Sequence, residues 1–376
     1  MTDIEKRKEL NIIDCSSIIH QSFHSKYRTG NDNIEGVPVD GLFKIFTIVT
    51  NVLMMDGDVA LCLDSRSFRK DIIPDYKGKR AKTNAEIIVQ LVMIEKMLEA
   101  LEVPFYKDAE RGLEADDLIF NCVEDYHPYY NIIKIHSGDY DLAHNIRDDA
   151  NVTMEGTALT KNVSKYNYQD VLSKKSSDIE IVFNTKTPYN VLLGDSDLSG
   201  VFKCSDASAT EMFRKYVSIC KEYNMTGLQS RDRTIFTKLI NTFFSLTEQE
   251  KQDFETRCDI FYPKRVTDLD CKIINSDWLF EEKFLEFLLM LNCDLIKGQL
   301  SNFKMTTVGR ELEPYLDKYY RYIDRGQKAP VVLPELFNEI KSDYFGGAYN
   351  HRKRINRKST EEIKKVSFGD SFDELF

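Results

Sequence analysis

Hydrophobic and polar positions in the first half of the chain alternate between short apolar runs and longer segments with helical spacing. The apolar runs are residues 10–14 (LNIID), 59–64 (VALCLD) and 131–136 (NIIKIH), and they predict three strands. Apolar residues recur at helical intervals over 84–101 and 115–126, and this spacing predicts two helices. Strands that alternate with helices are typical of a parallel sheet. We therefore predict an α/β fold with a mostly parallel central sheet.

The second half of the chain has few strand signals and is mostly helical in pattern. Apolar positions at helical spacing run through 234–244 and 278–295. We predict an α/β domain over residues 1–185 and a helical domain over residues 186–345. Residues 346–376 are basic at first and then acidic and aromatic, a composition that predicts a flexible tail.

Composition narrows the class of protein. The 376 residues are 42% hydrophobic and 30% charged, as is typical of a soluble globular protein. No apolar stretch of the sequence reaches the roughly 20 residues that a membrane-spanning helix needs, so we expect no contact with a membrane. The charged N-terminus lacks the apolar segment of a secretory leader, and we expect a cytoplasmic protein. The eight cysteines lack metal-binding spacing, so we expect neither disulfides nor structural zinc.

Carboxylates recur where the predicted strands end and where one predicted helix begins. In open α/β sheets, ligands bind outside the carboxyl ends of the strands, so we expect these side chains to converge. Carboxylates at close range repel one another unless a cation neutralises them, and Mg²⁺ prefers oxygen ligands of this kind. Two such ions would support phosphodiester hydrolysis. The candidate metal ligands are Asp14, Asp64, Glu114, Asp116, Asp117, Asp139 and Asp141.

Each of these acidic residues also has a purely structural interpretation. An aspartate after a strand is common as a helix N-cap or as a turn residue. For any single aspartate this alternative stays open. The grouped carboxylates in the sequences GLEADD (residues 112–117) and SGDYD (residues 137–141) favour a shared metal site, because a cap needs only one carboxylate.

A basic segment, which we call the gateway, covers residues 65–82 (SRSFRKDIIPDYKGKRAK). It holds seven Lys or Arg and two Asp, a local charge of +5 in a chain with a net charge of −10. The net charge argues against a surface that binds nucleic acid indiscriminately, but the gateway directly follows Asp64 and would lie beside the carboxylates. A solvated surface loop is the alternative. The candidate phosphate contacts are Lys77, Lys79 and Arg80, and the candidate base-stacking rings are Phe68 and Tyr76.

Four motifs in order resemble those of the metal-dependent 5′ nuclease family, which includes flap endonucleases and the 5′-exonuclease domain of bacterial DNA polymerase I. The motifs are IIDCS (residues 12–16), LCLDSRSFRKDIIPDYKGKR (61–80), GLEADDLIF (112–120) and IHSGDYDLAHNI (135–146). The resemblance implies a PIN-like 5′ nuclease sheet and a C-terminal helical domain that binds DNA. It further implies an enzyme that acts as a structure-dependent 5′-3′ exonuclease or flap endonuclease on RNA–DNA and DNA duplexes with 5′ ends or flaps.

The resemblance also assigns roles to residues. It implies that all seven carboxylates hold two Mg²⁺ ions, with Mn²⁺ as an alternative metal, and that Lys77 and Arg80 contact the reacting phosphate. No side-chain nucleophile is implied. The other implied nucleic-acid contacts in the gateway are Phe68, Arg69, Tyr76 and Lys79.

A fifth block, LLGDSDLSGVFKC (residues 192–204), departs from the family pattern. Asp195 matches the first aspartate of the family's motif, while Asp197 arrives one residue early. The glycine-rich helix-hairpin-helix is reduced to Gly200, so we expect a degenerate hairpin, with Lys203 as a further nucleic-acid contact. This region is similar to the T-even bacteriophage RNase H branch of the family, which implies removal of RNA primers in phage replication.

Two other functions remain open. A PIN-type RNA endonuclease would share the acidic site, although such domains are typically shorter and lack the gateway block. A non-catalytic replication factor that only binds branched DNA would explain the irregular residues 195–200. Residues 367–376 (SFGDSFDELF) resemble peptides that dock on a sliding clamp, and a clamp or a single-strand-binding protein is the expected partner. The family resemblance implies a monomer.

Overall fold

The structure is a computed structural model that divides into two compact units. Unit 1 comprises Met1–Arg7, Ser65–Ala81 and Asp108–Leu269, and unit 2 comprises Lys8–Asp64, Lys82–Lys107 and Asp270–Phe376. Each unit draws on both halves of the chain, whereas the sequence prediction divides the chain at residue 185. The structure describes residues 7–24, 33–34, 37–78, 83–146, 151–155, 186–194, 206–270, 272–291, 307–308, 310–311 and 331–345.

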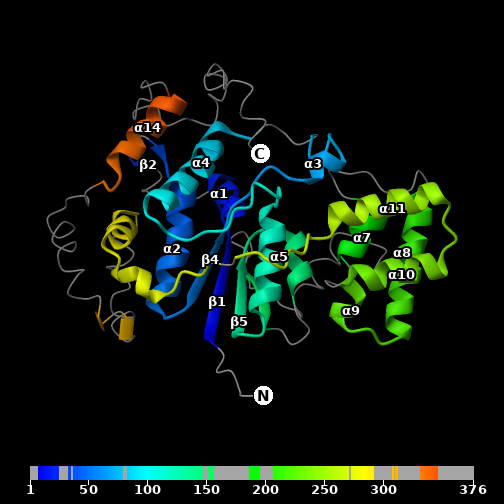
Figure 1. The fold of residues 1–376 in the computed structure, drawn as a ribbon. Coiled ribbons are helices and arrows are strands. Elements are labelled where there is room, and N and C mark those ends of the chain that lie inside the picture. Colours follow the sequence, from blue (N-terminus) through cyan, green and yellow to red (C-terminus); the bar gives the residue numbers. More distant parts are fainter. Residues whose placement is uncertain are drawn as a thin grey trace. The chain divides into compact units, whose positions relative to one another are not determined.

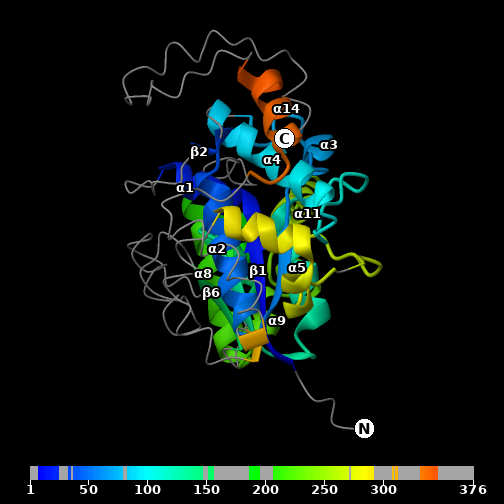
Figure 2. The ribbon, with the colours of Figure 1, turned by 90° about the vertical axis from the view of Figure 1, so that its left-hand side faces the viewer.

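Unit 2 is built on two parallel strands covered by helices (Figure 1). The two strands are in register from Leu10 opposite Asp58 to Asp14 opposite Cys62. Helix α2 packs on β4, α1 packs on α2 and α4, and α14 lies against α4 (Figure 2). The elements are β1 (Arg7–Asp14), α1 (Cys15–His24), β2 (Asn33–Ile34), β3 (Val37–Pro38), α2 (Asp40–Met54), β4 (Asp58–Cys62), α4 (Ala85–Ala100), η3 (Ser276–Phe280) and α14 (Pro334–Phe345).

The core of unit 2 joins segments from both ends of the chain. The Phe46 ring in α2 makes edge contacts with Phe284 and Phe287, with ring centroids 6.4 and 4.9 Å apart. Val59 and Ile274 exchange two backbone hydrogen bonds of 2.8 Å, which extends the pairing of β4. All five side chains are buried. The hydrophobic core therefore requires residues beyond 270 in addition to the N-terminal strands.

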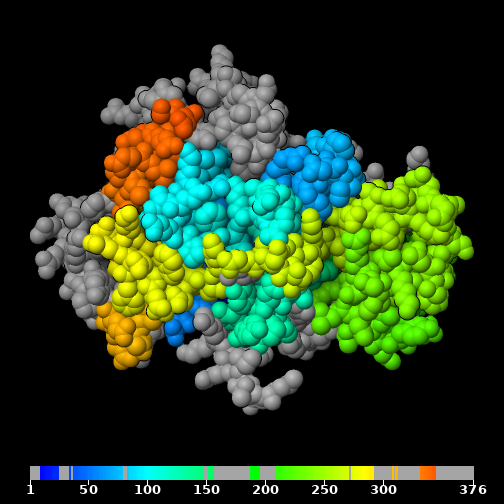
Figure 3. All heavy atoms as spheres, in the orientation of Figure 1, coloured from blue at the N-terminus to red at the C-terminus, as the bar shows by residue number. Residues whose placement is uncertain are grey.

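Unit 1 contains a second pair of parallel strands and a group of helices. β5 and β6 are in register from Ile133 opposite Val152 to His136 opposite Glu155. Helices α7 to α11 pack on one another, and α8 to α11 appear as one closely packed green body in the space-filling view (Figure 3). The elements are α3 (Arg69–Ile72), α5 (Ala115–Tyr126), β5 (Tyr130–His136), η1 (Tyr140–Asn145), β6 (Val152–Glu155), α7 (Lys186–Leu193), α8 (Asp206–Glu222), α9 (Gly227–Arg231), α10 (Arg233–Phe243) and α11 (Glu248–Phe261).

The helices of unit 1 share an aromatic core. Phe236 in α10 contacts Tyr216 in α8 at 4.9 Å and Phe254 in α11 at 5.4 Å between ring centroids. Helix α11 begins with a capping box, in which Thr247 and Glu250 exchange hydrogen bonds between side chain and backbone. These interactions fix the position of the chain that leaves α11 at Phe261, which matters for the site described below.

The α/β class with a parallel central sheet is confirmed. The three apolar runs form β1, β4 and β5, and the two predicted helices are α4 and α5. Strand β6 was not predicted, because its four residues are too few to produce a clear pattern. The predicted degenerate hairpin at 195–200, with Lys203, and the predicted tail at 346–376 lie outside the described residues. Among the helices in the described part of the chain, none has the length and apolar character to cross a membrane.

Candidate active site

Two of the predicted carboxylates lie at one end of the strand pair in unit 2. Asp14 is the last residue of β1 and stands opposite Cys62, the last residue of β4, and Asp64 follows two residues later. Burial raises the pKa of the Cys15 thiol, and the negative charges of Asp14 and Asp64 raise it further. Both carboxylates therefore act on the same buried group, as expected for neighbouring parallel strands.

Asp14 also has the structural role that the sequence left open. Its Oδ1 accepts a hydrogen bond of 2.9 Å from the backbone N–H of Ser17, in the first turn of α1. This contact satisfies one of the N–H groups that a helix start leaves unpaired. A cap and a metal ligand are compatible here, because a carboxylate has two oxygens.

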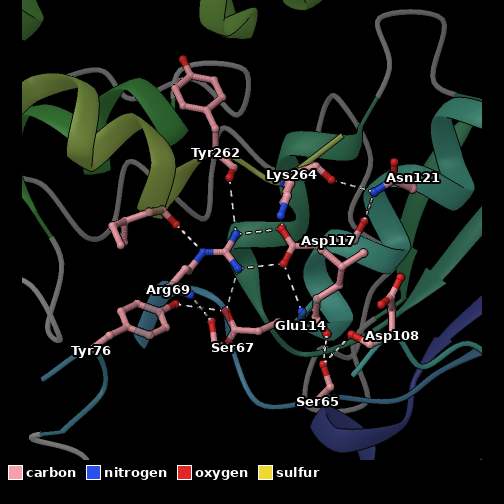
Figure 4. A network of polar contacts seen from close by, with 12 residues as sticks. Ser65, Ser67, Arg69, Tyr76, Asp108, Glu114, Asp117, Asn121, Tyr262 and Lys264 are labelled. Atoms are coloured by element: carbon pink, nitrogen blue, oxygen red, sulfur yellow. Dashed lines mark hydrogen bonds and ion pairs between the residues drawn. The ribbon is translucent and has the colours of Figure 1, made fainter. Parts of the chain in front are cut away.

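A buried ion-pair network organises the start of α5 in unit 1 (Figure 4). The guanidinium of Arg69, only 4% exposed, binds Asp117 through two parallel hydrogen bonds of 2.7 Å. Its Nη1 also donates to Glu114 Oε2 at 2.9 Å, and its Nε donates to the carbonyl of Ile260 at 2.7 Å. Burial lowers the pKa of this guanidinium, but the hydrogen bonds and charge of Asp117 outweigh burial and raise it overall. Arg69 therefore stays charged.

The carboxylate of Asp117 is fully occupied by protein donors. Besides the two bonds from Arg69, Oδ1 accepts from the backbone N–H of Lys264 at 2.8 Å and Oδ2 from that of Glu114 at 3.1 Å. Its exposed fraction is 0%. Asp117 thus joins the gateway, the start of α5 and the chain beyond α11. Its predicted role as a metal ligand stays a prediction.

Arg69 is held in the same network. The sequence predicts a nucleic-acid contact, but the side chain is buried and directed into the Asp117 network. The reason is the acidic pair at the start of α5, because two buried carboxylates need a buried cation.

Glu114 binds three side chains of the gateway. Its Oε1 accepts from the ammonium of Lys77, and its Oε2 accepts from the Tyr76 hydroxyl at 3.2 Å as well as from Arg69. Burial raises the pKa of the Glu114 carboxyl, but the positive charges of Lys77 and Arg69 outweigh burial and lower it overall. Glu114 is therefore held as an anion. Lys77, predicted as a phosphate contact, pairs with this carboxylate in the structure.

A glycine allows the gateway to approach α5. Gly112 has a positive φ of 61°, and a Cβ built on it would lie 2.8 Å from the Phe68 nitrogen and 2.9 Å from the Arg66 oxygen. The Phe68 N–H donates to the Gly112 carbonyl at 2.9 Å. Both the backbone conformation and the close contact therefore require glycine at the first position of the GLEADD motif.

The remaining predicted carboxylates of unit 1 are more accessible. Asp116 is half-buried on α5, and Asp139 and Asp141 are exposed just after β5. Asp139 caps η1 by accepting from the Asp141 N–H at 2.9 Å, and Asn190 in α7 donates to Asp141 Oδ1 at 3.3 Å. The exposed pair retains access to solvent and hence to ligands.

The predicted metal centre is not assembled within either unit alone. Asp14 and Asp64 belong to unit 2, and the other five carboxylates belong to unit 1. Among the described residues, no group of three or more acidic, histidine or cysteine side chains is arranged to hold a metal ion. The donors themselves are carboxylate oxygens, which suit Mg²⁺ and Mn²⁺. The residues predicted to act here that fall outside the described part of the chain are Lys79, Arg80, Asp195, Asp197, Gly200 and Lys203.

One basic residue was missed by the sequence reasoning. Lys264 donates its backbone N–H to Asp117, and its ammonium lies 4.5 Å from the centroid of the Phe68 ring. The Arg69 guanidinium lies 4.6 Å from the same ring. Phe68, predicted to stack on a base, thus contacts two cations. The only sequence signal for this position was the adjacent basic pair Lys264 and Arg265 after Pro263.

Comparison with known proteins shows which family the first part of the chain resembles. Residues 9–176 match the family model described as the 5′-3′ exonuclease, N-terminal resolvase-like domain. This segment is similar to the 5′-3′ exonuclease family. It contains all four motifs on which the predicted resemblance rests. The similarity to the T-even bacteriophage branch stays a prediction.

Relatives of the 5′-3′ exonuclease segment occur as separate proteins and as parts of polymerases. The 5′-3′ exonuclease of Mycoplasma genitalium is 28% identical over 53% of this chain and 68% of its own length. DNA polymerase I of Bacillus subtilis is 26% identical over 57% of this chain, and the match spans 24% of the polymerase. Among solved structures, the bacteriophage T5 D15 flap endonuclease aligns with 82% of this chain and 100% of its own, at 12% identity and a TM-score of 0.43.

Proposed function

We propose that this chain is a metal-dependent 5′-3′ exonuclease or flap endonuclease that hydrolyses phosphodiesters at the 5′ ends of RNA–DNA and DNA duplexes. The observation that carries the proposal is the family match over residues 9–176, which includes every motif carboxylate from Asp14 to Asp141. The positions of Asp14 and Asp64 at one end of a parallel strand pair support it. Because the match spans only about a quarter of the related polymerases, the activity is proposed from this segment alone.

The proposed ligands for two Mg²⁺ or Mn²⁺ ions are the motif carboxylates other than Asp117. When bound, such ions supply an activated water and stabilise the charge on the leaving oxygen. We assign Asp117 a positioning role in place of a ligand role, because four protein donors already occupy its oxygens. The proposed ligands are Asp14, Asp64, Glu114, Asp116, Asp139 and Asp141, together with Asp195 and Asp197.

The gateway residues prepare the site for an anionic substrate. Arg69 and Asp117 fix the backbone and carboxylate of Glu114, so that this group needs no reorganisation when the substrate enters. In the proposal, Lys77 leaves Glu114 for the scissile phosphate and stabilises its developing charge together with Arg80. Arg69 contributes through Glu114 and makes no contact with nucleic acid.

The finer parts of the function remain predictions. They include removal of RNA primers in phage replication, a monomeric state, cytoplasmic location and docking of residues 367–376 on a sliding clamp or single-strand-binding protein. Deleting residues 367–376 would remove clamp-dependent stimulation if the docking prediction holds.

The test of the proposed function is cleavage of labelled substrates by the full chain. A 5′-labelled RNA–DNA duplex, a nicked duplex, a 5′-flap DNA and a single-stranded RNA are incubated with Mg²⁺ or with a chelator. We expect Mg²⁺-dependent release of short 5′ products and its loss in Asp139→Asn. The matched control is Asp253→Asn, a carboxylate in α11 bonded to Gln249, which should cleave normally.

Other outcomes identify the alternatives. Flap binding without cleavage under any divalent metal favours a branched-DNA-binding factor. Cleavage restricted to the single-stranded RNA favours a PIN-type RNA endonuclease. Full activity of Asp139→Asn would remove Asp139 from the site.

A further inference from the structure

Unit 1 contains a pocket that the proposed chemistry does not use. Its volume is about 670 Å³, within the range of roughly 300 to 1,000 Å³ that small-molecule sites occupy. It is lined by gateway residues Phe68 and Ile72, by α5, by the junction of α9 and α10, and by the end of α11 with the segment that follows it. The carboxylates in the lining are Glu124, Asp232 and Asp259. The pocket therefore adjoins the gateway.

One wall of the pocket is aromatic. The ring of Phe120 lies 5.5 Å from that of His144, and His144 lies 5.9 Å from Tyr262, both in edge-to-face geometry. Tyr262 is only 6% exposed, and its hydroxyl has no hydrogen-bond partner among the described residues. At the rim, Ile72 and Leu228 are 38% and 44% exposed. The lining thus offers flat apolar surfaces to a ligand.

Three of the four Lys and Arg side chains that line the pocket have anionic or carbonyl partners. Arg233 pairs with Glu255 and Asp259, Arg265 pairs with Asp125, and Arg231 donates to the carbonyl of Ile146.

Lys264 differs from these three side chains. It is exposed, and within the described part of the chain its ammonium contacts the Phe68 ring and no carboxylate. An aromatic ring holds a cation without neutralising it, so this ammonium keeps its charge available to an anion.

We propose that this pocket binds one unpaired nucleotide of the substrate, with its base against Phe120 and its phosphate on Lys264. Aromatic side chains beside an uncompensated cation suit a nucleotide, because every base has a stacking face and every linkage carries a negative charge. Neither a neutral apolar ligand nor a peptide without acidic groups would use Lys264. The inference rests on the proposed function, because it assumes a nucleic-acid substrate.

The test compares flap binding with duplex binding in matched variants. The probes are a 5′-flap DNA and the same duplex without the flap, measured by fluorescence anisotropy in Ca²⁺ at several salt concentrations. We expect Lys264→Ala to weaken flap binding about tenfold, with a salt slope smaller by about one, and to change duplex binding less than about twofold. Phe120→Leu, which keeps the apolar volume but removes the ring, should weaken flap binding at least about fivefold.

The control variant is Lys215→Ala. Lys215 also places its ammonium over an aromatic ring, 4.7 Å from the centroid of Phe244, but it does not line the pocket. It should bind both probes as the unchanged chain does. Circular dichroism checks that each variant is folded.

Three results would contradict the pocket, the base stacking or the proposed function. Unchanged flap binding in Lys264→Ala, or an equal loss on flap and duplex, overturns the pocket assignment. Unchanged flap binding in folded Phe120→Leu overturns the stacking of the base. If the unchanged chain neither binds nor cleaves any nucleic acid, the proposed function itself fails, a result distinct from failure of the pocket alone.

Discussion

Two acidic residues of unit 1 that belong to one sequence motif have different surroundings in the structure. Glu114 and Asp117 both belong to the GLEADD motif, yet Asp117 is enclosed by four protein donors, while Glu114 faces the gateway side chains Lys77 and Tyr76. The difference arises because Arg69, from the preceding gateway segment, uses both outer nitrogens on Asp117. Asp117 therefore links three segments of unit 1, whereas Glu114 binds side chains of the gateway.

The Arg69 network should dominate the stability of unit 1. Replacing Arg69 by Leu leaves Asp117 buried without its cation, so we expect a loss of about 3–5 kcal/mol in the free energy of unfolding. Arg233→Leu removes ion pairs that are about two-fifths exposed and should cost about 0–1 kcal/mol. Urea unfolding of both variants measures the difference. Equal midpoints for Arg69→Leu and the unchanged chain would contradict this account of the network.

The ends of strands and helices place the carboxylates of the candidate site. β1 ends at Asp14 and α1 begins at the next residue, so the residue that ends the strand also caps the helix through its side chain. Two contacts come from a part of the chain that is distant in sequence. The last turn of α11 supplies the Ile260 carbonyl to Arg69, and the chain that leaves α11 supplies the Lys264 N–H to Asp117.

The double role of Asp14 can be divided by substitution. Asparagine caps a helix as well as aspartate does but carries no charge, so Asp14→Asn should keep the stability and lose Mg²⁺-dependent cleavage. Asp14→Ala should lose cleavage and also about 1 kcal/mol of stability. Urea unfolding and the flap assay give the two readouts. Wild-type cleavage by Asp14→Asn would exclude Asp14 from the site, and equal destabilisation of both variants would contradict the cap.

At the scale of the whole molecule, the two units do not follow the order of the chain. Unit 2 combines strands from the first 64 residues with segments beyond residue 270, and its core joins Phe46 to Phe284 and Phe287. Unit 1 combines the gateway with residues 108–269. The segment that matches the 5′-3′ exonuclease family therefore extends over parts of both units.

A fragment of residues 1–185 should not fold as the full chain does. It lacks Ile274, Phe284 and Phe287, so the buried face of Phe46 and the edge of β4 would be open to water. We expect no cooperative thermal transition and association in size-exclusion chromatography. In the full chain, Phe287→Ala should cost about 3–5 kcal/mol as a control for the same contact. A monomeric fragment that unfolds cooperatively would contradict this prediction.

The parts of the structure that could be predicted are those that depend on residues close together in the sequence. The strand ends at Asp14 and Asp64 follow from short apolar runs, and the helix after Glu114 follows from apolar spacing and an N-terminal acidic group. The contact of Lys264 with Asp117 could not be predicted, because 147 residues separate the partners and the bond uses a backbone N–H that leaves no trace in the sequence.

The fold class, the resemblance to the 5′-3′ exonuclease family and the list of acidic residues could be read from the sequence alone, because period, motif order and residue type are local properties. Only the tertiary structure decided which carboxylates are consumed and which remain exposed. Arg69, Asp117 and the backbone N–H of Lys264 come from three distant segments, and the charges of Arg69 and Asp117 are satisfied only when those segments pack together. Burial of Arg69 and Asp117 makes this pairing obligatory, since an unpaired buried charge costs several kcal/mol.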